Sequence, residues 1–160
     1  MSVDSVRAYL RQYDLADKVL EFPVSSATVE EAAAALQCEG RRIAKTMSFL
    51  VDGHAVLIVM AGDARVDNGK YKERFHTKAV MLKGDEVEAL TGHPVGGVCP
   101  FALPQGAQVY LDRSLQRFGT VFPACGSRNS AIELTPSELE RVTGCIGWVD
   151  VGKGWDEAGD

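Results

Sequence analysis

A loop rich in glycine and proline constrains the fold more than any other stretch of the chain. Residues 92–104, Gly-His-Pro-Val-Gly-Gly-Val-Cys-Pro-Phe-Ala-Leu-Pro, contain three glycines and three prolines. Proline fixes φ at about −65° and glycine tolerates positive φ, so the stretch suits neither a helix nor the interior of a strand. The apolar residues Val95, Val98 and Phe101 argue against a solvated linker. We therefore predict a shaped loop whose backbone N–H groups face a ligand, with a structural turn at a sheet corner as the alternative.

Length and composition indicate one globular domain over residues 1–160. The 160 residues are 46% hydrophobic and 24% charged, which is ordinary for a domain of this size. No apolar run approaches the roughly 20 residues that span a bilayer, and the first residues lack the features of a signal peptide. We expect a cytoplasmic protein without a membrane partner. The cysteines form no C-x-x-C pair, which predicts reduced thiols rather than a disulfide framework or a zinc site; they are Cys38, Cys99, Cys125 and Cys145.

The net charge of −5 opposes non-specific adhesion to nucleic acid, because such binding comes mainly from phosphate neutralisation by Lys and Arg. An RNA partner would need a local basic patch. Two candidates exist, Arg41, Arg42 and Lys45 in one and Arg65, Lys70, Lys72, Arg74 and Lys78 in the other. A run of charge is more often a solvated surface, so these patches carry little weight alone.

Periodicity and capping signals predict short helices and strands without the regular alternation of a parallel doubly wound sheet. The expected helices cover residues 3–13, 28–36, 68–75, 85–91 and 136–143, and the expected strands 43–51, 55–60, 79–82, 109–111, 121–124, 131–134 and 146–151. Asp85 is the expected cap of the fourth helix, and residues 152–160 read as a frayed tail. The predicted fold class is α/β of the α+β type, a curled or barrel-like mixed, largely antiparallel sheet surrounded by helices.

Lys45 occupies an unusual place in the first long strand. The two-residue period of a strand puts it on the same face as Met47 and Phe49, where a core residue is expected. The alternative is that Lys45 lies at the strand edge and extends its ammonium group to water.

The usual enzyme templates are absent from the sequence. It has no nucleophile elbow, phosphate loop, dinucleotide fingerprint or paired-histidine metal motif. Cys99 beside His93 could act as an activated thiolate, although a small buried cysteine is the alternative. Two glycine-bearing loops and one displaced lysine suit a site that binds through backbone donors and a cation and stabilises an oxyanion.

Four segments in this order resemble the YbaK/EbsC family, free-standing relatives of the editing domain in bacterial prolyl-tRNA synthetases. They are residues 44–46, 62–67, 92–101 and 126–130, within a resemblance that covers about residues 20–151. The resemblance implies the curled mixed sheet, a cytoplasmic aminoacyl-tRNA deacylase without a cofactor, and a mischarged tRNA as substrate. The amino acid would be small, such as Ala, Ser or Cys, with tRNA-Pro as one candidate carrier and a synthetase as a further candidate partner.

The resemblance also implies roles for residues of this chain. Lys45 would hold the phosphate or sugar of the terminal adenosine, and backbone N–H groups of the Gly96–Pro100 segment would hold the ester carbonyl. A ribose hydroxyl of the substrate would help to activate the water. The implied catalytic residues are Lys45, Gly96, Gly97 and Val98, and the implied substrate-binding residues are Thr46, His93, Cys99, Pro100, Phe101, Gly126, Ser127, Arg128 and Asn129.

The sequence also bears on the size of the pocket and on competing functions. Many relatives have glycine where Ala102 stands, and the added methyl could narrow the pocket or the backbone freedom of the loop. Val95, Val98 and Phe101 are expected to restrict the pocket to small side chains. The competing functions are a non-catalytic nucleotide- or protein-binding regulator of the EbsC type and a thioesterase-like enzyme that uses Cys99.

Overall fold

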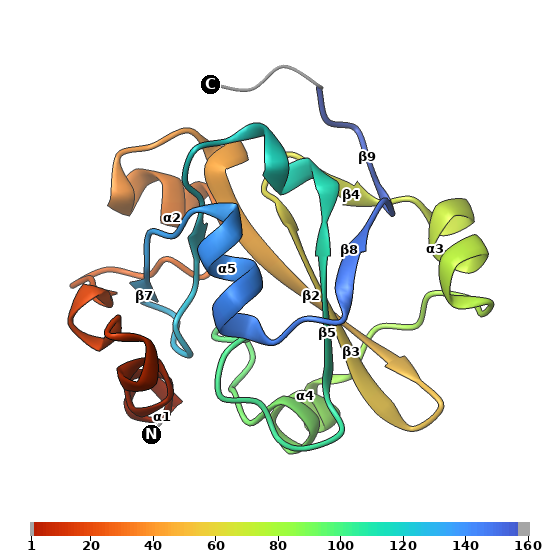
Figure 1. Cartoon of the computed structure of the whole chain (residues 1–160), viewed down its shortest axis with the longest axis horizontal. Coiled ribbons are helices and arrows are strands. Elements are labelled where there is room, and N and C mark those ends of the chain that lie inside the picture. Colours follow the sequence, from red (N-terminus) through yellow and green to blue (C-terminus); the bar gives the residue numbers. More distant parts are fainter. Residues whose placement is uncertain (1, 157–160) are drawn as a thin grey trace.

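A five-stranded sheet lies at the centre of the computed structural model, which describes residues 2–156 (Figure 1). Its strand order is β6-β2-β3-β5-β8, with β2 at Ile43–Val51, β3 at His54–Ala61, β5 at Gln108–Asp112, β6 at Phe122–Pro123 and β8 at Gly147–Val149. β2 and β3 form an antiparallel hairpin. Asp52 and Gly53 make its turn, and both have the positive φ that a tight two-residue hairpin turn requires (φ 49° and 84°).

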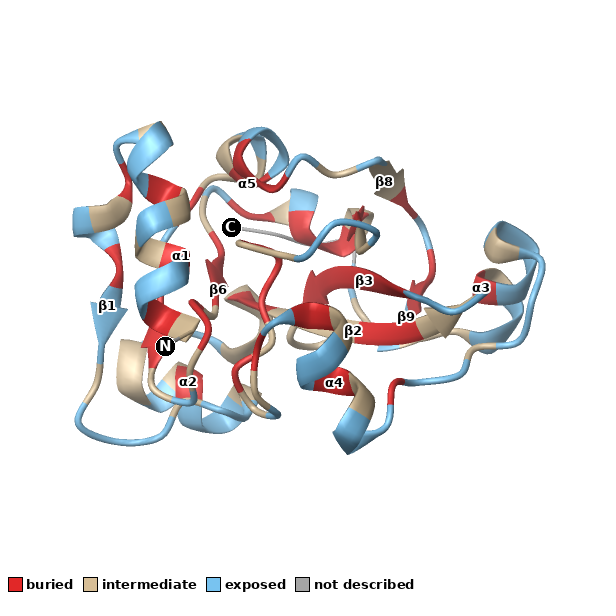
Figure 2. Ribbon diagram, turned by 90° about the horizontal axis from the view of Figure 1, so that it is seen from below, coloured by how far each residue is buried: buried red, intermediate tan, exposed pale blue. Residues whose placement is uncertain are grey.

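Both faces of β3 are buried, and its residues alternate between two hydrophobic clusters. Ala55, Leu57 and Val59 belong to the larger cluster, whereas Ile58 and Met60 belong to a second one on the other face. This alternation follows from the two-residue period of a strand. Figure 2 shows β3 coloured as buried along most of its length.

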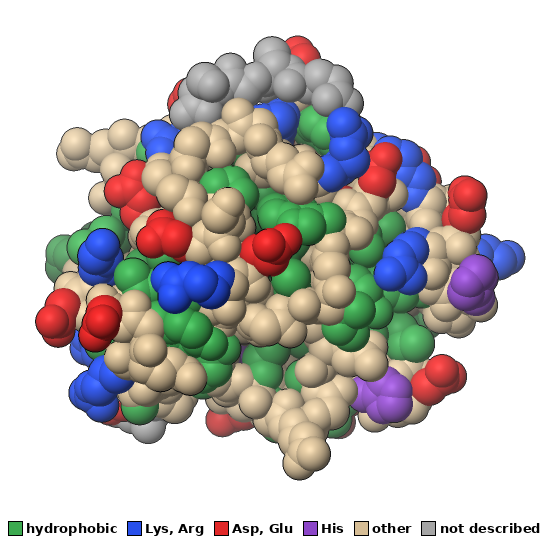
Figure 3. Space-filling model, viewed as in Figure 1, with side chains coloured by type: hydrophobic (Ala, Val, Ile, Leu, Met, Phe, Trp, Pro, Cys, Tyr) green, Lys and Arg blue, Asp and Glu red, His purple; other side chains and the backbone are tan. Residues whose placement is uncertain are grey.

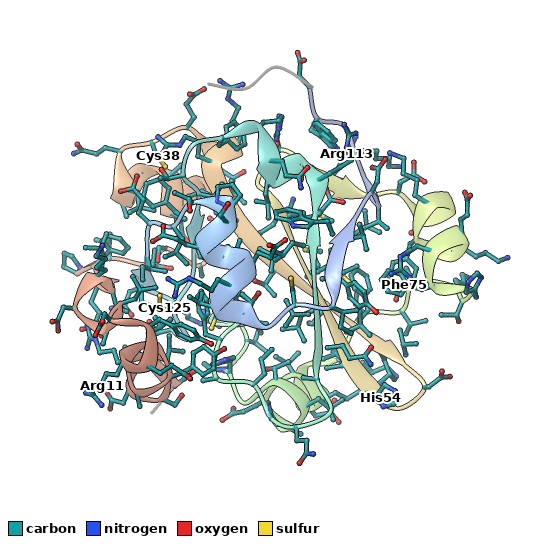
Figure 4. The ribbon with its side chains drawn as sticks, in the orientation of Figure 1. Arg11, Cys38, His54, Phe75, Arg113 and Cys125 are labelled. Carbon is teal, nitrogen blue, oxygen red and sulfur yellow. The ribbon has the colours of Figure 1, made fainter. Side chains whose placement is uncertain are left out.

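Helices cover the two faces unequally. α1 (Ser2–Leu10), α4 (Gly84–Thr91) and α5 (Pro136–Thr143) contribute to the larger cluster. α3 (Asn68–Phe75) lies at the opposite end of the molecule from α1 and packs Tyr71 into the second cluster (Figures 1 and 2). Phe75, labelled in Figure 4, reaches from α3 to the ring of Tyr110 in an edge-on contact at 5.1 Å between centroids. α2 (Val29–Leu36) packs on the start of β2 and on β6 through a small third cluster that includes Ala32, Ile43 and Phe122.

Shorter elements complete the structure. β1 (Leu20–Glu21) pairs with β7 (Ser130–Ala131), and β4 (Arg65–Val66) pairs with β9 (Gly152–Lys153), both antiparallel. Single 3-10 turns occupy Arg11–Tyr13, Ala16–Lys18, Gly40–Arg42 and Arg113–Arg117. No helix within residues 2–156 is long and apolar enough to cross a bilayer.

The fold class predicted from the sequence, a curled mixed sheet surrounded by helices, is confirmed. The helices at 28–36 and 136–143 begin at the expected capping boxes of Thr28 and Thr135. The strand directions differ from the expectation of a largely antiparallel sheet: within the central sheet β2–β6, β3–β5 and β5–β8 are all parallel. Parallel pairs need long crossover connections, and the short apolar runs of this sequence do not reveal which strands those connections join.

Three local expectations were wrong. Residues 79–82 form only an isolated bridge between Met81 and Phe49 rather than a strand. α4 begins at Gly84, so Lys83 rather than Asp85 is its N-cap residue. The N–H of Lys83 donates to the carboxylate of Glu86 at 2.8 Å, and Glu86 therefore supplies the capping side chain. The first residues of the expected tail, Gly152–Lys153, form β9 and pair with β4. No local sequence pattern predicts this pairing. Residues 157–160 of the expected tail lie outside the described residues.

Candidate active site

A cavity of about 420 Å³ opens beside the outer edge of β2. Residues 43–48 of β2 form one wall, residues 26–29 and 32 at the start of α2 a second, and residues 81, 82 and 87 before and within α4 a third. Val95, Gly96 and Val98 bring the glycine–proline loop to the fourth side. The loop and the displaced lysine, which are separate in sequence, therefore meet at one cavity.

Thr46 presents unpaired polar groups to this cavity. β6 pairs with β2 only at Ile43 and Ala44, while Ser48 accepts from the N–H of Leu82 at 3.1 Å. Even-numbered residues of β2 turn their backbone groups to this outer edge, so those of Thr46 lie in the gap between the two pairings. Its Oγ1 is buried and has no hydrogen-bond partner among the described residues. Such an orphaned hydroxyl beside a cavity is a group that a bound water or ligand would satisfy.

Lys45 lies at the junction of this cavity and a smaller neighbour. It shares the smaller cavity with Met47 and Phe49, so the predicted common face of these residues is confirmed. Its Nζ donates to the carbonyl of Gly62 at 3.4 Å. Burial lowers the pKa of Lys45, the nearby Asp63 opposes that shift, and the positive charge of Arg65 adds to it.

Gly62 is required where it stands because its backbone passes very close to the turn at Gly40. A Cβ at Gly62 would lie 2.1 Å from the Gly40 carbonyl oxygen. Real side chains do not reach such a distance, so only glycine allows this approach. The contact fixes the position of the carbonyl that accepts from Lys45.

The glycine–proline loop offers two backbone donors at the cavity. The N–H of Gly97 donates to the Pro94 carbonyl at 2.9 Å and is therefore used within the loop. The N–H groups of Gly96 and Val98 have no acceptor in the part of the chain that the structure describes, and both residues line the cavity. Of the backbone donors predicted for this segment, Gly97 is therefore occupied, and Gly96 and Val98 remain the candidates.

Residues 126–129 support the loop from behind. A Cβ at Gly97 would lie 2.9 Å from the backbone of Gly126 and of Ser127, so the two loops are in direct backbone contact. Arg128 donates through Nε to the Val95 carbonyl at 3.3 Å. The N–H of Phe22 donates to the carbonyl of Asn129, and the side-chain amide of Asn129 donates to the carbonyl of Phe22. Ser130 lines the cavity, whereas none of residues 126–129 does.

His93, Cys99 and Phe101 lie in the core behind the loop, each fully buried, and Pro100 is also buried. The Nε2–H of His93 donates to the carbonyl of Phe101 at 2.7 Å, which leaves Nδ1 to accept from the hydroxyl of Ser2. Burial raises the pKa of Cys99 to about 12, so its sulfur is a neutral thiol near pH 7. None of these residues lines the cavity, and a direct contact with a ligand there would require the loop to move.

Several cavity residues were missed by sequence reasoning. The apolar walls come from Val29 and Ala32 of α2, Ile43 of β2, Phe122 of β6 and Met81. Val29 and Ala32 are three residues apart and share one helix face, which is a signal for a buried stripe. No sequence pattern, however, says that this stripe faces β2. Among residues 2–156 no group of His, Cys, Asp and Glu side chains is arranged to hold a metal ion.

The family model of the aminoacyl-tRNA editing domain matches residues 24–142, which include α2, Lys45 and both loops. The chain belongs to this family. The editing domain is 53% identical over 157 residues to the uncharacterized protein YwhH of Bacillus subtilis (strain 168), covering 98% of this chain and all of that protein. It is 34% identical to proline–tRNA ligase of Desulfovibrio desulfuricans over 125 residues, which are 78% of this chain and 21% of the ligase. The chain thus spans about a fifth of that relative's length.

Solved structures share the fold of this editing domain. A crystal structure presented as a proposed trans-editing enzyme for prolyl tRNA synthetase superposes with a TM-score of 0.86 at 31% identity, covering 96% of this chain and 98% of that one. The crystal structure of the hypothetical protein APE2540 gives a TM-score of 0.83 at 33% identity, covering 93% and 99% of the two chains.

Proposed function

We propose that this editing domain is an aminoacyl-tRNA deacylase that hydrolyses the ester of a mischarged tRNA and removes a small amino acid. One observation carries the proposal: Lys45, the amides of Gly96 and Val98 and the unpaired edge of β2 at Thr46 all reach the same cavity. The cavity thus offers a cation, two backbone donors and free acceptors around one space, which is what an ester linking an amino acid to a ribose requires.

Each group has a distinct role in the proposed reaction. Lys45 binds the phosphate or sugar of the terminal adenosine, which places the ester beside the loop. The N–H groups of Gly96 and Val98 donate to the carbonyl oxygen and stabilise the negative charge that it gains in the transition state. The Thr46 hydroxyl and carbonyl accept from the amino group of the substrate. A water oxygen bonds to the carbonyl carbon, and the bond to the ribose oxygen breaks as that oxygen takes up a proton.

Residues around the cavity act by holding these donors in place. Gly97, Gly126, Ser127, Arg128 and Asn129 set the position of the loop through the contacts described above. His93, Cys99, Pro100 and Phe101 form the buried base on which the loop rests. Because about 1 Å of misplacement can cost about 10²-fold in rate, such support is a part of the proposed site.

The walls of the cavity favour a small side chain. Val29, Ala32, Val95, Val98 and Phe122 make them largely apolar. Phe101, expected from the sequence as a further wall, packs instead against Tyr9 in the core, with 6.5 Å between ring centroids. Pockets of this kind distinguish side chains that differ by one methylene only by about 10–200-fold, so we propose a preference among Ala, Ser and Cys rather than absolute selection.

A deacylation screen tests the proposal. tRNA-Pro charged separately with alanine, serine, cysteine, proline and phenylalanine is incubated with the protein, and the remaining ester is measured over time. We expect hydrolysis of one or more small residues, with weaker binding at higher salt as phosphate contacts are screened. On the face shown in Figure 3 acidic and basic side chains are interspersed, so we propose a modest salt dependence. Absence of hydrolysis together with salt-independent binding would favour the regulator instead, and a preference for phenylalanine would refute the small pocket.

A further inference from the structure

A second cavity of about 220 Å³ adjoins the first one. The two share Lys45, Met47 and Met81, so the lysine lies at the boundary between them. The larger cavity holds the loop donors and the Thr46 edge, and the smaller one reaches the start of α3. A ligand that binds Lys45 at its middle can therefore extend into both.

The lining of the smaller cavity differs from that of a charged binding cleft. Its interior is apolar and is formed by Met47, Phe49, Met60, Val66, Ala79 and Met81. Methionine side chains are flexible and polarizable, and they make favourable contacts with aromatic rings. Single-stranded nucleic acid is commonly bound through the flat faces of its bases on such apolar or aromatic surfaces.

Polar residues also line this cavity: Lys45, Arg65 and Asn68, which is the first residue of α3. Arg65 is close enough to Lys45 for its charge to act on that group, while Asp63, which offsets it, is already paired with Arg117 at 2.6 Å. Glu30 is a further carboxylate that acts on Lys45, and it does so more weakly than Asp63. Two neighbouring cations whose main carboxylate is paired with Arg117 form a site for an anion such as a phosphate.

We propose that the smaller cavity binds the adenine base of the terminal nucleotide of the tRNA, with its phosphate on Lys45 and Arg65. The inference rests on the proposed function, because it assigns the larger cavity to the aminoacyl group. Asn68 is the specificity-determining residue: an asparagine amide can bond to N6 and N7 of adenine at once. The base then lies against Met81, Met47 and Phe49, and the ester lies over Lys45 beside the loop.

Methionine NMR tests the subsite without any reaction. Three of the four methionines, Met47, Met60 and Met81, line the cavity, and Met1 is the fourth. With methyl-¹³C methionine, adenosine 5′-monophosphate should shift the three cavity resonances, and ribose 5-phosphate should shift them much less. An equal response to the two compounds, or no response at millimolar adenosine 5′-monophosphate, would overturn the assignment to the base.

Kinetics test the same subsite on the substrate. An alanylated minihelix ending in adenosine is compared with one ending in purine riboside, which lacks the exocyclic amine. Loss of one hydrogen bond should reduce kcat/KM about fivefold for the wild type, and Asn68→Ala should remove this difference. Gln116→Ala, which changes an exposed amide elsewhere, is the matched control and should keep it.

The two proposals fail separately. If the wild type hydrolyses both minihelices equally, the base subsite is wrong while the deacylase function stands. If neither is hydrolysed but the methionine shifts are seen with adenosine 5′-monophosphate, the deacylase function is wrong while the nucleotide site stands.

Discussion

Replacing Gly97 by alanine tests whether the contact between the two loops sets the geometry of the site. The new Cβ would lie 2.9 Å from backbone atoms of Gly126 and Ser127, and ordinary contact begins at 3.4 Å, so the loops must separate by 0.5 Å (3.4 − 2.9). Backbone atoms cannot rotate away as a side chain could. Overpacking of this kind costs about 1–3 kcal/mol, which corresponds to a fall in Tm of about 2–12 °C for a chain of this length.

The same shift should lower activity because Gly96 and Val98 flank the altered residue. If about 1 Å of misplacement costs about 10²-fold, the 0.5 Å separation should reduce kcat by about tenfold. Thermal unfolding followed by circular dichroism and single-turnover deacylation measure the two effects. Gly147→Ala is the matched control, since nothing lies within 4 Å of its new Cβ. A wild-type Tm together with a wild-type kcat in Gly97→Ala would show that the contact between the two loops does not set the geometry of the site.

Three further changes test buried groups and the backbone of the loop. Burial lowers the pKa of His93 in the folded protein, so the unfolded chain binds a proton on this side chain more readily. The free energy of unfolding, measured in urea, should therefore be highest above pH 6.5 and should fall as the pH drops below that value. This fall should be smaller in His93→Gln. An equal loss in both would remove His93 as the cause. Cys99→Ser should keep the wild-type deacylation rate. Loss of activity in a correctly folded Cys99→Ser variant would instead support the thioesterase-like enzyme that uses Cys99. Ala102 has φ 54°, so Ala102→Gly should stabilise the fold by up to about 1 kcal/mol in urea titration, and marked destabilisation would contradict this.

Local signals in the sequence were sufficient for most elements. The Thr135-Pro136 capping box, the Asp52-Gly53 turn and the alternation along β2 and β3 each depend on residues close in sequence, and the structure contains them. The parallel pairing of β5 with β3 depends instead on contacts between residues far apart in sequence. No local period encodes such a pairing, and the same holds for β4 with β9.

In the candidate site too, features that depend on nearby residues could be predicted, and features that depend on distant contacts could not. Lys45 could be singled out because a lysine is unusual between apolar residues on one strand face, and the glycine–proline loop because of its composition. The sequence could not show that Gly97 donates within the loop or that His93 and Cys99 lie behind it, since both follow from how the loop packs on residues 126–127 and on α1. The gap in the pairing of β2 at Thr46 likewise arises from where β6 ends.

Deacylation by the Lys45→Ala variant shows whether the ammonium group of Lys45 takes part in the proposed reaction. Lys45 is half-buried at the junction of the two cavities, and loss of a charged hydrogen-bond donor to the substrate should cost about 1.5–3 kcal/mol, or about 10–150-fold in kcat/KM. Lys18→Ala, an exposed lysine in the turn after α1, is the control. We expect the wild type and Lys18→Ala to hydrolyse a mischarged tRNA, whereas folded Lys45→Ala loses most of the activity. Equal hydrolysis by all three proteins would contradict it.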